Sequence, residues 1–540
     1  MHASNLADLR STHLNRRAIE AMKEESAPGA SSWLESIEIG EATGVGILQS
    51  DILPAFIEKR RWYASKDKGR PAVRISRMIP IPAGASRDVL LAVLDVEPPN
   101  SPLERYLLAL GFADFARQGP LSPFFIADAR LFGEAGVLID AAADDAFIRT
   151  VLGTISDAAE VSMSPDLAVH RTAALSGLED QLQTAAIRRG DAEQSNTSII
   201  LGDLAVLKLI RKLQVGVHPE PEIGAFLTEA AHFQNTPALL GFVEYRAPEG
   251  PMLLTVLQEF VANQGDGWKV VSELLKATLD DGDRKRGADR RSLEIARQLG
   301  VRTAEMHHAF ATPTDDPAFA PEPVGGAVLE AWIASVEDMA RRAMEGLEKA
   351  APSIRGPARD RVEELLDKRD LSSRIAALRP ENPEVVRTRI HGDYHLGQVL
   401  ITPDDVYIVD FEGEPMRPLS ERRQKHSPLR DVAGMLRSIA YVAGAAAQDR
   451  GIALSPEFLG EWTRTMSDAF LAAYREAIAG CVSYPADPTA ADRLLNVFLL
   501  EKACYEITYE LANRPEWVVI PVTGVLDLLD SPSLSHSGAR

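Results

Sequence analysis

The first half of the chain carries short apolar runs that are separated by turn residues. The runs at 88–96, "DVLLAVLDV", and at 250–261, "GPMLLTVLQEFV", each predict a buried strand. Two further runs within residues 196–213 are joined by Gly202-Asp203, a dipeptide typical of hairpin turns. This half is therefore predicted to consist mainly of strands. Helices are expected over residues 102–118 and 223–233.

Beyond residue 268 the apolar residues recur with the period of an amphipathic helix. A short ribbon interrupts this pattern, because "QVLI" and "VYIVDF" flank a turn, "TPDD", between Gln398 and Phe411. The last long helix contains "NVFLLEKACYEITYELAN" and is expected to break at Asn513–Pro515, since proline cannot continue a helix. Other helices are predicted over residues 292–311, 327–350 and 357–378.

These patterns predict an α+β protein with several folding units. The chain has 540 residues, whereas single domains typically hold ~100–200 residues. Composition changes mark the expected boundaries. We expect a flexible polar tail over 1–45, strand-rich units over 46–150 and 151–262, and a helix-rich unit over 263–540.

Composition and charge narrow the class of protein. The hydrophobic fraction is 45% and the charged fraction 25%, which is typical of globular proteins. The formal net charge of −20 disfavours nucleic acid or an anionic membrane as a partner. Cys481 and Cys504 are the only cysteines, so the sequence supports neither a disulfide framework nor a cysteine-based zinc site. The N-terminus lacks the apolar core of a signal peptide, and no run approaches ~20 apolar residues, so we expect a cytoplasmic protein.

The ribbon and its lead-in, "RIHGDYHLGQVLITPDDVYIVDFEGEP", gather oxygen-bearing side chains at residues 389–415. Phosphoryl transfer needs a magnesium site with oxygen ligands and a group that orients the attacking hydroxyl. Gln398 and Asp410 suit the metal, and Asp393 suits the hydroxyl. The alternative is that Asp393 shapes a turn and Asp410 caps the next element. A metal pair of His391 and His395 is disfavoured, because Gly392 and the strand pattern argue against a helix there.

The order H-G-D-x-H-x-x-Q followed by V-D-F-E resembles the catalytic and metal loops of the aminoglycoside-phosphotransferase branch of the protein-kinase-like superfamily. The resemblance implies that Asp393 is the catalytic base and that Gln398 and Asp410 hold Mg²⁺, with ATP as phosphoryl donor. Many members of that superfamily carry Asn where Gln398 stands. Glutamine offers the same amide oxygen on a longer arm.

A kinase-like site also needs a strand lysine for the phosphates and a helix glutamate that holds it. Lys208 lies on the second hairpin strand and Glu222 at the start of the next helix, so the two residues follow one another as such a site requires. An edge-strand lysine and a glutamate favoured by the helix dipole are the structural alternatives. No G-x-G-x-x-G precedes Lys208. The residues expected to contact the nucleotide are instead Ser195, Asn196 and Thr197 in the turn before the hairpin, and Gln258, Glu259 and Val261 at the hinge.

The C-terminal helix offers an acceptor site. Lys502, Tyr505 and Tyr509 follow an i, i+3, i+7 spacing and so share one helix face. A cation beside phenol rings suits a sugar, whose hydroxyls form hydrogen bonds and whose ring stacks on aromatic side chains. The alternative is a tyrosine stripe that packs in the core.

Several segments resemble the bacterial maltokinases, in order over roughly residues 46–530: "RRWYASK", "QEFVANQGDGW", "HGDYHLGQVL", "VDFEGEPMRPLSERRQKHSPLRDVAGMLRS" and "EKACYEITYELANRPEW". This implies a bilobal kinase-like fold in which 46–150 forms an N-terminal cap subdomain, 151–262 an intermediate nucleotide-binding subdomain, and 263–540 a helical C-terminal lobe. It also implies ATP-dependent phosphorylation of maltose at the anomeric hydroxyl for α-glucan synthesis, with trehalose synthase as a possible partner. Lys502, Tyr505, Tyr509 and His395 would then line the maltose pocket.

Other residues are secondary candidates. Asp431 resembles the aspartate that braces the catalytic loop in kinase-like folds. Two rivals to maltose phosphorylation remain: a kinase of another sugar such as glucosamine, and a non-catalytic partner of trehalose synthase. Aminoglycoside phosphorylation is a weaker rival. Basic residues that follow the metal loop could complement phosphates, with solvated surface as the alternative for most of them: Arg417, Arg422, Arg423, Lys425 and His426. Arg61, Trp62 and Lys66 lie in the expected cap, and their chemistry does not follow from the sequence.

Overall fold

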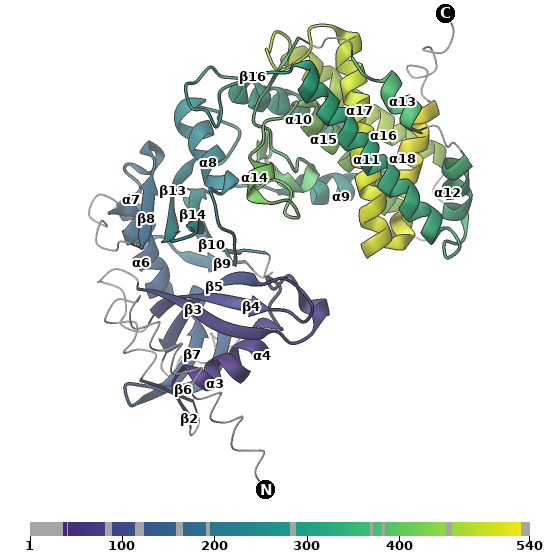
Figure 1. The fold of residues 1–540 in the computed structure, drawn as a ribbon. Coiled ribbons are helices and arrows are strands. Elements are labelled where there is room, and N and C mark those ends of the chain that lie inside the picture. The colour runs from purple at the N-terminus through teal and green to yellow at the C-terminus, as the bar shows by residue number, and fades with distance from the viewer. Residues whose placement is uncertain are drawn as a thin grey trace, which may run out of the picture. The chain divides into compact units, whose positions relative to one another are not determined.

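The computed structural model describes residues 36–39, 42–80, 89–113, 124–157, 166–190, 195–280, 288–367, 371–380, 384–449 and 456–530 (Figure 1). The chain divides into two compact units. The first unit comprises 1–225 and 238–260, and the second comprises 226–237 and 261–540.

The first unit begins with an antiparallel sheet that has eight strands among the described residues, in the order β2-β1-β6-β7-β5-β4-β3, with β12 beside β5. The strands are β1 (Ile37–Ile39), β2 (Ala42–Thr43), β3 (Ala72–Pro80), β4 (Val89–Glu97), β5 (Glu104–Ala113), β6 (Phe125–Leu131), β7 (Glu134–Asp140) and β12 (Lys212–Leu213). Short helical segments precede β3: α3 (Val45–Ile47), η1 (Leu48–Ile52), α4 (Leu53–Ile57) and η2 (Lys66–Lys68). They cover one face of the sheet with a core that includes Trp62 and Tyr106.

Two expectations for this region need correction. The helix predicted over 102–118 is wrong where the structure describes it, because residues 104–113 form strand β5. This strand pairs with β4, β7 and β12, and Tyr106–Leu110 are buried throughout. A continuous apolar run does not distinguish a buried strand from a buried helix, so only the sheet pairing decides. The predicted tail overlaps the sheet, since Ile37 pairs with Leu131, while residues 1–35 lie outside the described residues.

A second antiparallel sheet in the same unit has the order β8-β13-β14-β11-β10-β9. Its strands are β8 (Leu167–Arg171), β9 (Ile187–Arg189), β10 (Thr197–Leu201), β11 (Ala205–Leu209), β13 (Leu239–Ala247) and β14 (Gly250–Glu259). The hairpin predicted at Gly202-Asp203 is confirmed, because Ser198 of β10 pairs with Lys208 of β11 and Gly202 has a positive φ of 56°. Gly202 thus takes a backbone conformation that side chains disfavour.

Helix α6 (Asp145–Ser156) joins the two sheets into one core. Its residues Phe147 and Val151 pack in a cluster that includes Leu91 of β4 and Leu207 of β11. Asp144 caps this helix, because its carboxylate accepts a hydrogen bond from the amide of Ala146. The remaining helical segments of the unit are η5 (Ala141–Ala143), η6 (Ala173–Leu175), α7 (Glu179–Thr184) and α8 (Pro219–Ala225).

The second unit is mostly helical, as predicted (Figure 1). Its main helices are α9 (Gly267–Asp280), α10 (Arg290–Phe310), α11 (Gly326–Ala350), α12 (Pro357–Asp367), α13 (Leu371–Ala377), α15 (Leu429–Asp449), α16 (Pro456–Ala477), α17 (Pro488–Asn513) and α18 (Val519–Asp530). Shorter elements are η7 (Phe226–Ala230), β15 (Gly265–Asp266), β16 (Glu322–Pro323), β17 (Val386–Arg387), α14 (Leu419–Arg422) and η9 (Pro515–Trp517). The predicted ribbon is present as η8 (Leu396–Gln398), β18 (Val399–Ile401) and β19 (Val406–Ile408), with β15 beside β18.

Helix α17 lies against α11, α15 and α18 (Figure 1). Asp487 starts it by accepting hydrogen bonds from the amides of Thr489 and Ala490, and Pro488 occupies a position where a missing N–H costs nothing. The predicted break is confirmed, because α17 ends at Asn513 and η9 begins at Pro515. Among the described helices, none combines the length and apolar character needed to span a bilayer.

Candidate active site

The loop from His391 to Gln398 leads into strand β18 and carries Asp393. Buried Asp431 on α15 accepts hydrogen bonds from the amides of His391 (2.8 Å) and Gly392 (2.9 Å). Burial alone would raise the pKa of Asp431, but hydrogen bonds from His307 and Gly392 and nearby positive charge hold it below its usual value. A charged carboxylate therefore fixes the two residues that precede Asp393.

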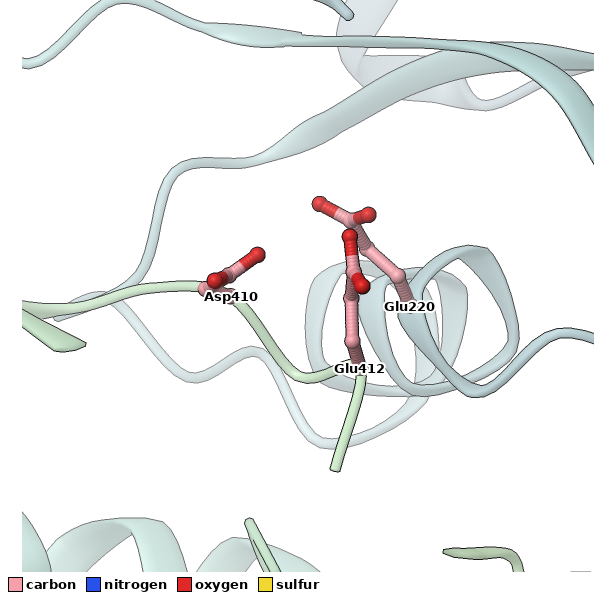
Figure 2. A group of neighbouring side chains, drawn as sticks. All are labelled: Glu220, Asp410 and Glu412. Atoms are coloured by element: carbon pink, nitrogen blue, oxygen red, sulfur yellow. The ribbon is translucent and has the colours of Figure 1, made fainter. Parts of the chain in front are cut away.

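The ribbon brings Gln398 and Asp410 to the same end. The amide of Val409 donates to the carbonyl of Gln398 at 3.0 Å, so Asp410 follows directly after the residue that pairs with Gln398. Asp410 adopts a positive φ of 70°, which is uncommon for a residue with a side chain and often marks a functional site. Figure 2 shows that Glu412 follows on the same segment, so a second carboxylate lies two residues after Asp410.

These oxygen ligands fit a hard divalent cation such as Mg²⁺. Glu412 was not singled out from the sequence, although it is the last letter of the V-D-F-E motif. The alternative histidine pair is not supported by the geometry. The Nε2 atom of His391 lies 3.0 Å from the carbonyl of Val409, and the Nδ1 atom of His395 accepts a hydrogen bond from the amide of Gly397 at 3.0 Å.

His395 and Asp393 face one another across the loop. The Nε2 atom of His395 lies 4.0 Å from Oδ2 of Asp393. Because Nδ1 of His395 accepts a hydrogen bond, the neutral ring carries its proton on Nε2, toward Asp393. Burial lowers the pKa of His395, and the charges of His391 and Lys502 lower it further, against the opposing effect of Asp393. His395 therefore acts as a neutral hydrogen-bond donor near neutral pH.

A cavity of about 530 Å³ opens beside this loop within the second unit. Volumes of roughly 300–1,000 Å³ are typical of small-molecule sites. The residues that line this cavity include the predicted catalytic and sugar-binding residues Asp393, His395, Lys502, Tyr505 and Tyr509. They come from two segments that are more than one hundred residues apart in the sequence. The tyrosine face of α17 is therefore turned toward a cavity, and Tyr509 is 44% exposed, which rules out a purely internal tyrosine stripe.

The cavity also contains charged residues that the sequence analysis missed. Glu506 and Glu510 follow Lys502 at four-residue intervals, so the same helix face carries them. Glu506 pairs with Arg437 of α15 at 2.8 Å, and Glu510 pairs with Arg514 at 2.7 Å. Burial raises the pKa of Glu506 despite the opposing charge of Arg437. The four-residue spacing from Lys502 would have placed both glutamates on the face that was predicted from Lys502, Tyr505 and Tyr509.

Glu414, after the metal loop, lines the cavity too. Burial would raise the pKa of Glu414, but the charge of Lys502 and the hydrogen bonds from Tyr505 and Arg417 together hold it below its usual value. The Lys502 ammonium lies 5.0 Å from the centre of the Tyr505 ring. Lys502, Tyr505 and Glu414 thus form one polar cluster at the wall next to Asp393.

Aromatic rings form another part of the wall. Arg514 lies 4.6 Å from the ring centre of Trp517 and 5.7 Å from that of Tyr509. Trp268, at the start of α9, also lines the cavity. The break after Asn513 is what turns Trp517 back toward the end of α17, so proline at position 515 contributes to the shape of the site.

In the first unit, Lys208 forms the ion pair that a kinase-like site requires, but with a different glutamate. Its ammonium lies 2.5 Å from Oε1 of Glu220, which is buried, whereas Glu222 is only partly buried. The sequence interpretation that assigned Glu222 is therefore corrected to Glu220. Both glutamates lie in the first turn of α8, and two residues correspond to about 200° of rotation, so they face opposite sides of the helix.

The other proposed nucleotide contacts lie at the ends of strands in this sheet. Ser195 and Asn196 directly precede β10, and Thr197 is its first residue. Gln258 pairs with Val206, and Glu259 ends β14. The amide of Glu259 donates to the carbonyl of Ala238 at 2.9 Å. Val261 is the first residue of the second unit after this strand.

The secondary candidates have mostly structural surroundings. Trp62 is buried against Tyr106, with ring centres 5.5 Å apart, while Arg61 and Lys66 are exposed. Lys425 is buried and pairs with Glu322 at 2.6 Å, which identifies it as a structural residue and not a phosphate ligand. The others take part in local contacts: His426 stacks on Trp332, Arg417 pairs with Glu414, Arg422 donates to the carbonyls of Pro415 and Arg417, and Arg423 follows α14.

Comparison with known families gives this site its chemical class. The phosphotransferase enzyme family known as APH matches residues 186–464, just over half of the chain. The chain therefore belongs to this family. The matched region includes Lys208, Glu220, Asp393, Gln398 and Asp410.

Two similar sequences are glucosamine kinases. The one from Streptacidiphilus jiangxiensis is 28% identical over 348 residues, which cover 62% of this chain and 72% of that protein. The one from Mycolicibacterium smegmatis is 29% identical over 344 residues, covering 63% of this chain and 78% of that protein.

Solved structures confirm the predicted fold class. A glucosamine kinase in complex with glucosamine, ADP and inorganic phosphate matches with a TM-score of 0.59 and 22% identity, over 88% of this chain and 97% of that chain. Another crystal form of a glucosamine kinase matches with a TM-score of 0.62, over 90% and 99% of the two chains. The predicted α+β kinase-like fold is thus confirmed.

Proposed function

We propose that this member of the phosphotransferase enzyme family is an ATP-dependent sugar kinase whose preferred acceptor is glucosamine. The observation that carries the proposal is the cavity beside Asp393, where a polar helix face and aromatic rings surround space for a small molecule. The residues of this cavity can orient hydroxyl groups, and Asp393 can accept a proton.

In the reaction, Asp393 accepts the proton of the attacking sugar hydroxyl. The hydroxyl oxygen forms a bond to the γ-phosphorus of ATP, the bond from that phosphorus to its bridging oxygen breaks, and ADP leaves. Asp431 keeps the amides before Asp393 in place, and the Nε2–H of His395 faces the same carboxylate. Most of the catalytic effect is therefore expected from positioning the two reactants.

Two further groups act on the nucleotide. Lys208 contacts the phosphates, and Glu220 holds its ammonium in place. Gln398, Asp410 and Glu412 are the oxygen ligands suited to Mg²⁺, which, when bound, neutralises the negative charge of the phosphates.

The charge of the cavity favours an amino sugar. Glucosamine is a cation near neutral pH, and four carboxylates line the cavity beside two basic side chains, Lys502 and Arg514. Glu506, which is buried and pairs with Arg437, is the carboxylate that we assign to the amine of the sugar. The two similar glucosamine kinases support this choice of acceptor over the maltose suggested first by the sequence.

Maltose is the second candidate, and a specific observation favours it. The cavity is large, and the rings of Tyr509, Trp517 and Trp268 offer stacking surfaces for a second sugar ring. The proposal of a trehalose synthase partner depends on this candidate alone.

The test is an acceptor panel with purified protein, Mg²⁺ and ATP. Glucosamine, glucose, N-acetylglucosamine, maltose and kanamycin are each offered, and products are identified by ³¹P and ¹³C NMR. We expect a phosphate ester on glucosamine as the dominant product. Phosphate on the anomeric oxygen of maltose would establish the second candidate instead, and phosphorylation of kanamycin alone would refute both sugars.

A further inference from the structure

Arg211 is a buried cation of the first unit with several hydrogen-bond partners. It lies between β11 and β12 and is 1% exposed. Its side chain donates to Oγ1 of Thr197 (2.8 Å), to Oδ2 of Asp140 (2.7 Å) and to the carbonyl of Leu107 (3.4 Å). Its guanidinium also lies 5.5 Å from the ring centre of Trp62.

These contacts belong to two different sheets. Thr197 starts β10, the strand that follows the turn proposed to contact the nucleotide, whereas Asp140 and Leu107 belong to β7 and β5 of the first sheet. The backbone of Arg211 makes the same connection. Its amide donates to Oδ1 of Asn196 at 3.3 Å, and its carbonyl accepts from the amide of Leu107 at 2.8 Å.

The chain passes from one sheet to the other at this residue. Lys208 pairs with Ser198 in the second sheet, while Lys212 pairs with Tyr106 in the first sheet. Lys212 also forms an ion pair with Glu104 at 2.6 Å. Arg211 therefore stands three residues after the lysine proposed for the phosphates and one residue before the strand that anchors the first sheet.

We propose that Arg211 is a positioning residue that couples the first sheet to the nucleotide-binding turn, so that nucleotide binding stabilises the first sheet. This inference rests on the proposed nucleotide contacts at residues 195–197 and Lys208. An arginine suits the role because its planar group donates in several fixed directions at once, which a lysine cannot do. Since coupling between two sites is reciprocal, a substitution that breaks the connection at Arg211 is expected to weaken nucleotide binding.

The first test is Arg211→Lys, which keeps the charge but loses the fork of donors. We expect the dissociation constant of a non-hydrolysable ATP analogue with Mg²⁺ to rise about tenfold, because the hydrogen bonds that hold Thr197 and Asn196 in place are weakened. The KM of the sugar acceptor should stay within about twofold. A second variant, Asp140→Asn, lies in the first sheet and is expected to weaken nucleotide binding in the same direction.

Arg105→Lys is the matched control. Arg105 also joins the two sheets, because it contacts Asp95 of β4 at 3.3 Å and Glu249 of the β13–β14 turn at 2.6 Å. Its side-chain partners are these two carboxylates, so the contacts differ from those of Arg211 with Asn196 and Thr197. Its substitution is expected to leave nucleotide affinity within about twofold of the wild type.

Hydrogen exchange of the Leu107 amide tests the coupling directly. If Arg211 only stabilised the fold, its substitution would not change how nucleotide binding affects this exchange. The amide of Leu107 should exchange at least about fivefold more slowly when the analogue is bound to the wild type and to Arg105→Lys. This protection should be absent in Arg211→Lys and in Asp140→Asn.

Equal affinity and equal Leu107 protection in folded Arg211→Lys would overturn the inference and leave the proposed function intact. If Arg211→Lys does not fold, Asp140→Asn decides the question by the same two measurements. Absence of nucleotide binding in the wild type would refute the proposed function itself, and the inference with it.

Discussion

The Lys208 ammonium lies 2.5 Å from the carboxylate of Glu220, whereas the sequence had suggested Glu222 as its partner. Glu220 faces the sheet from the first turn of α8 and is 1% exposed. A buried charge requires a partner of opposite sign, so the pair fixes the lysine side chain in one direction. Substitutions of Glu220 and Glu222 are therefore expected to have different effects on activity.

The first prediction compares Glu220→Gln with Glu222→Gln. Loss of the Glu220 charge releases the ammonium of Lys208, so the KM for ATP should rise about 10- to 100-fold and kcat should fall. The Glu222 variant is its matched control and should remain within about threefold of the wild type. Steady-state kinetics with varied ATP measure both, and a larger loss in the Glu222 variant would return the role to that residue.

The second prediction concerns Asp393. Replacement by Asn removes the proton acceptor and preserves the size of the side chain, so kcat should fall by roughly 10²- to 10⁴-fold. The dissociation constant of ATP with Mg²⁺ should change little, because Asp393 is assigned to the sugar hydroxyl. Calorimetric titration and rapid-quench assays check the two expectations. Full turnover in the variant would exclude Asp393 as the base.

The third prediction concerns Asp431 and pH. Asp431→Asn should destabilise the protein by about 2–3 kcal/mol and lower kcat, because two loop amides and His307 lose a charged acceptor. The pKa of Asp431 is lowered in the folded protein, so its contribution to stability is present above the unfolded pKa and is lost as pH falls through the folded value.

Denaturant titrations from pH 7 down to the acid range check this. The variant should lack the part of the acid destabilisation that Asp431 causes, so the two stability curves should converge at low pH. Parallel curves over the whole range would show that Asp431 has no shifted pKa.

The fourth prediction separates the two sugar candidates. Trp517→Ala should raise the KM for maltose by more than the KM for glucosamine if the aromatic wall contacts a second ring. Equal effects on both sugars would place Trp517 against the first ring. Phe132→Ala is a suitable control, since Phe132 is 57% exposed in the turn between β6 and β7 and does not line the cavity.

The candidate site could be predicted well where residues are close in sequence. The order around Asp393, the ribbon ending at Asp410 and the break at Asn513–Pro515 follow from local turn and helix chemistry. The i, i+3, i+7 spacing placed Lys502, Tyr505 and Tyr509 on one face, and the structure turns that face toward the cavity. The same spacing rule would have found Glu506 and Glu510.

What the sequence determined by itself is therefore local: which residues share a helix face, where strands turn, and which motif carries the chemistry. Long-range packing decided the rest. Residues 104–113 are a strand because β4, β7 and β12 satisfy their backbone hydrogen bonds, and Lys208 pairs with Glu220 because α8 turns that residue toward β11. Such choices depend on partners distant in the chain, and burial makes the wrong partner costly.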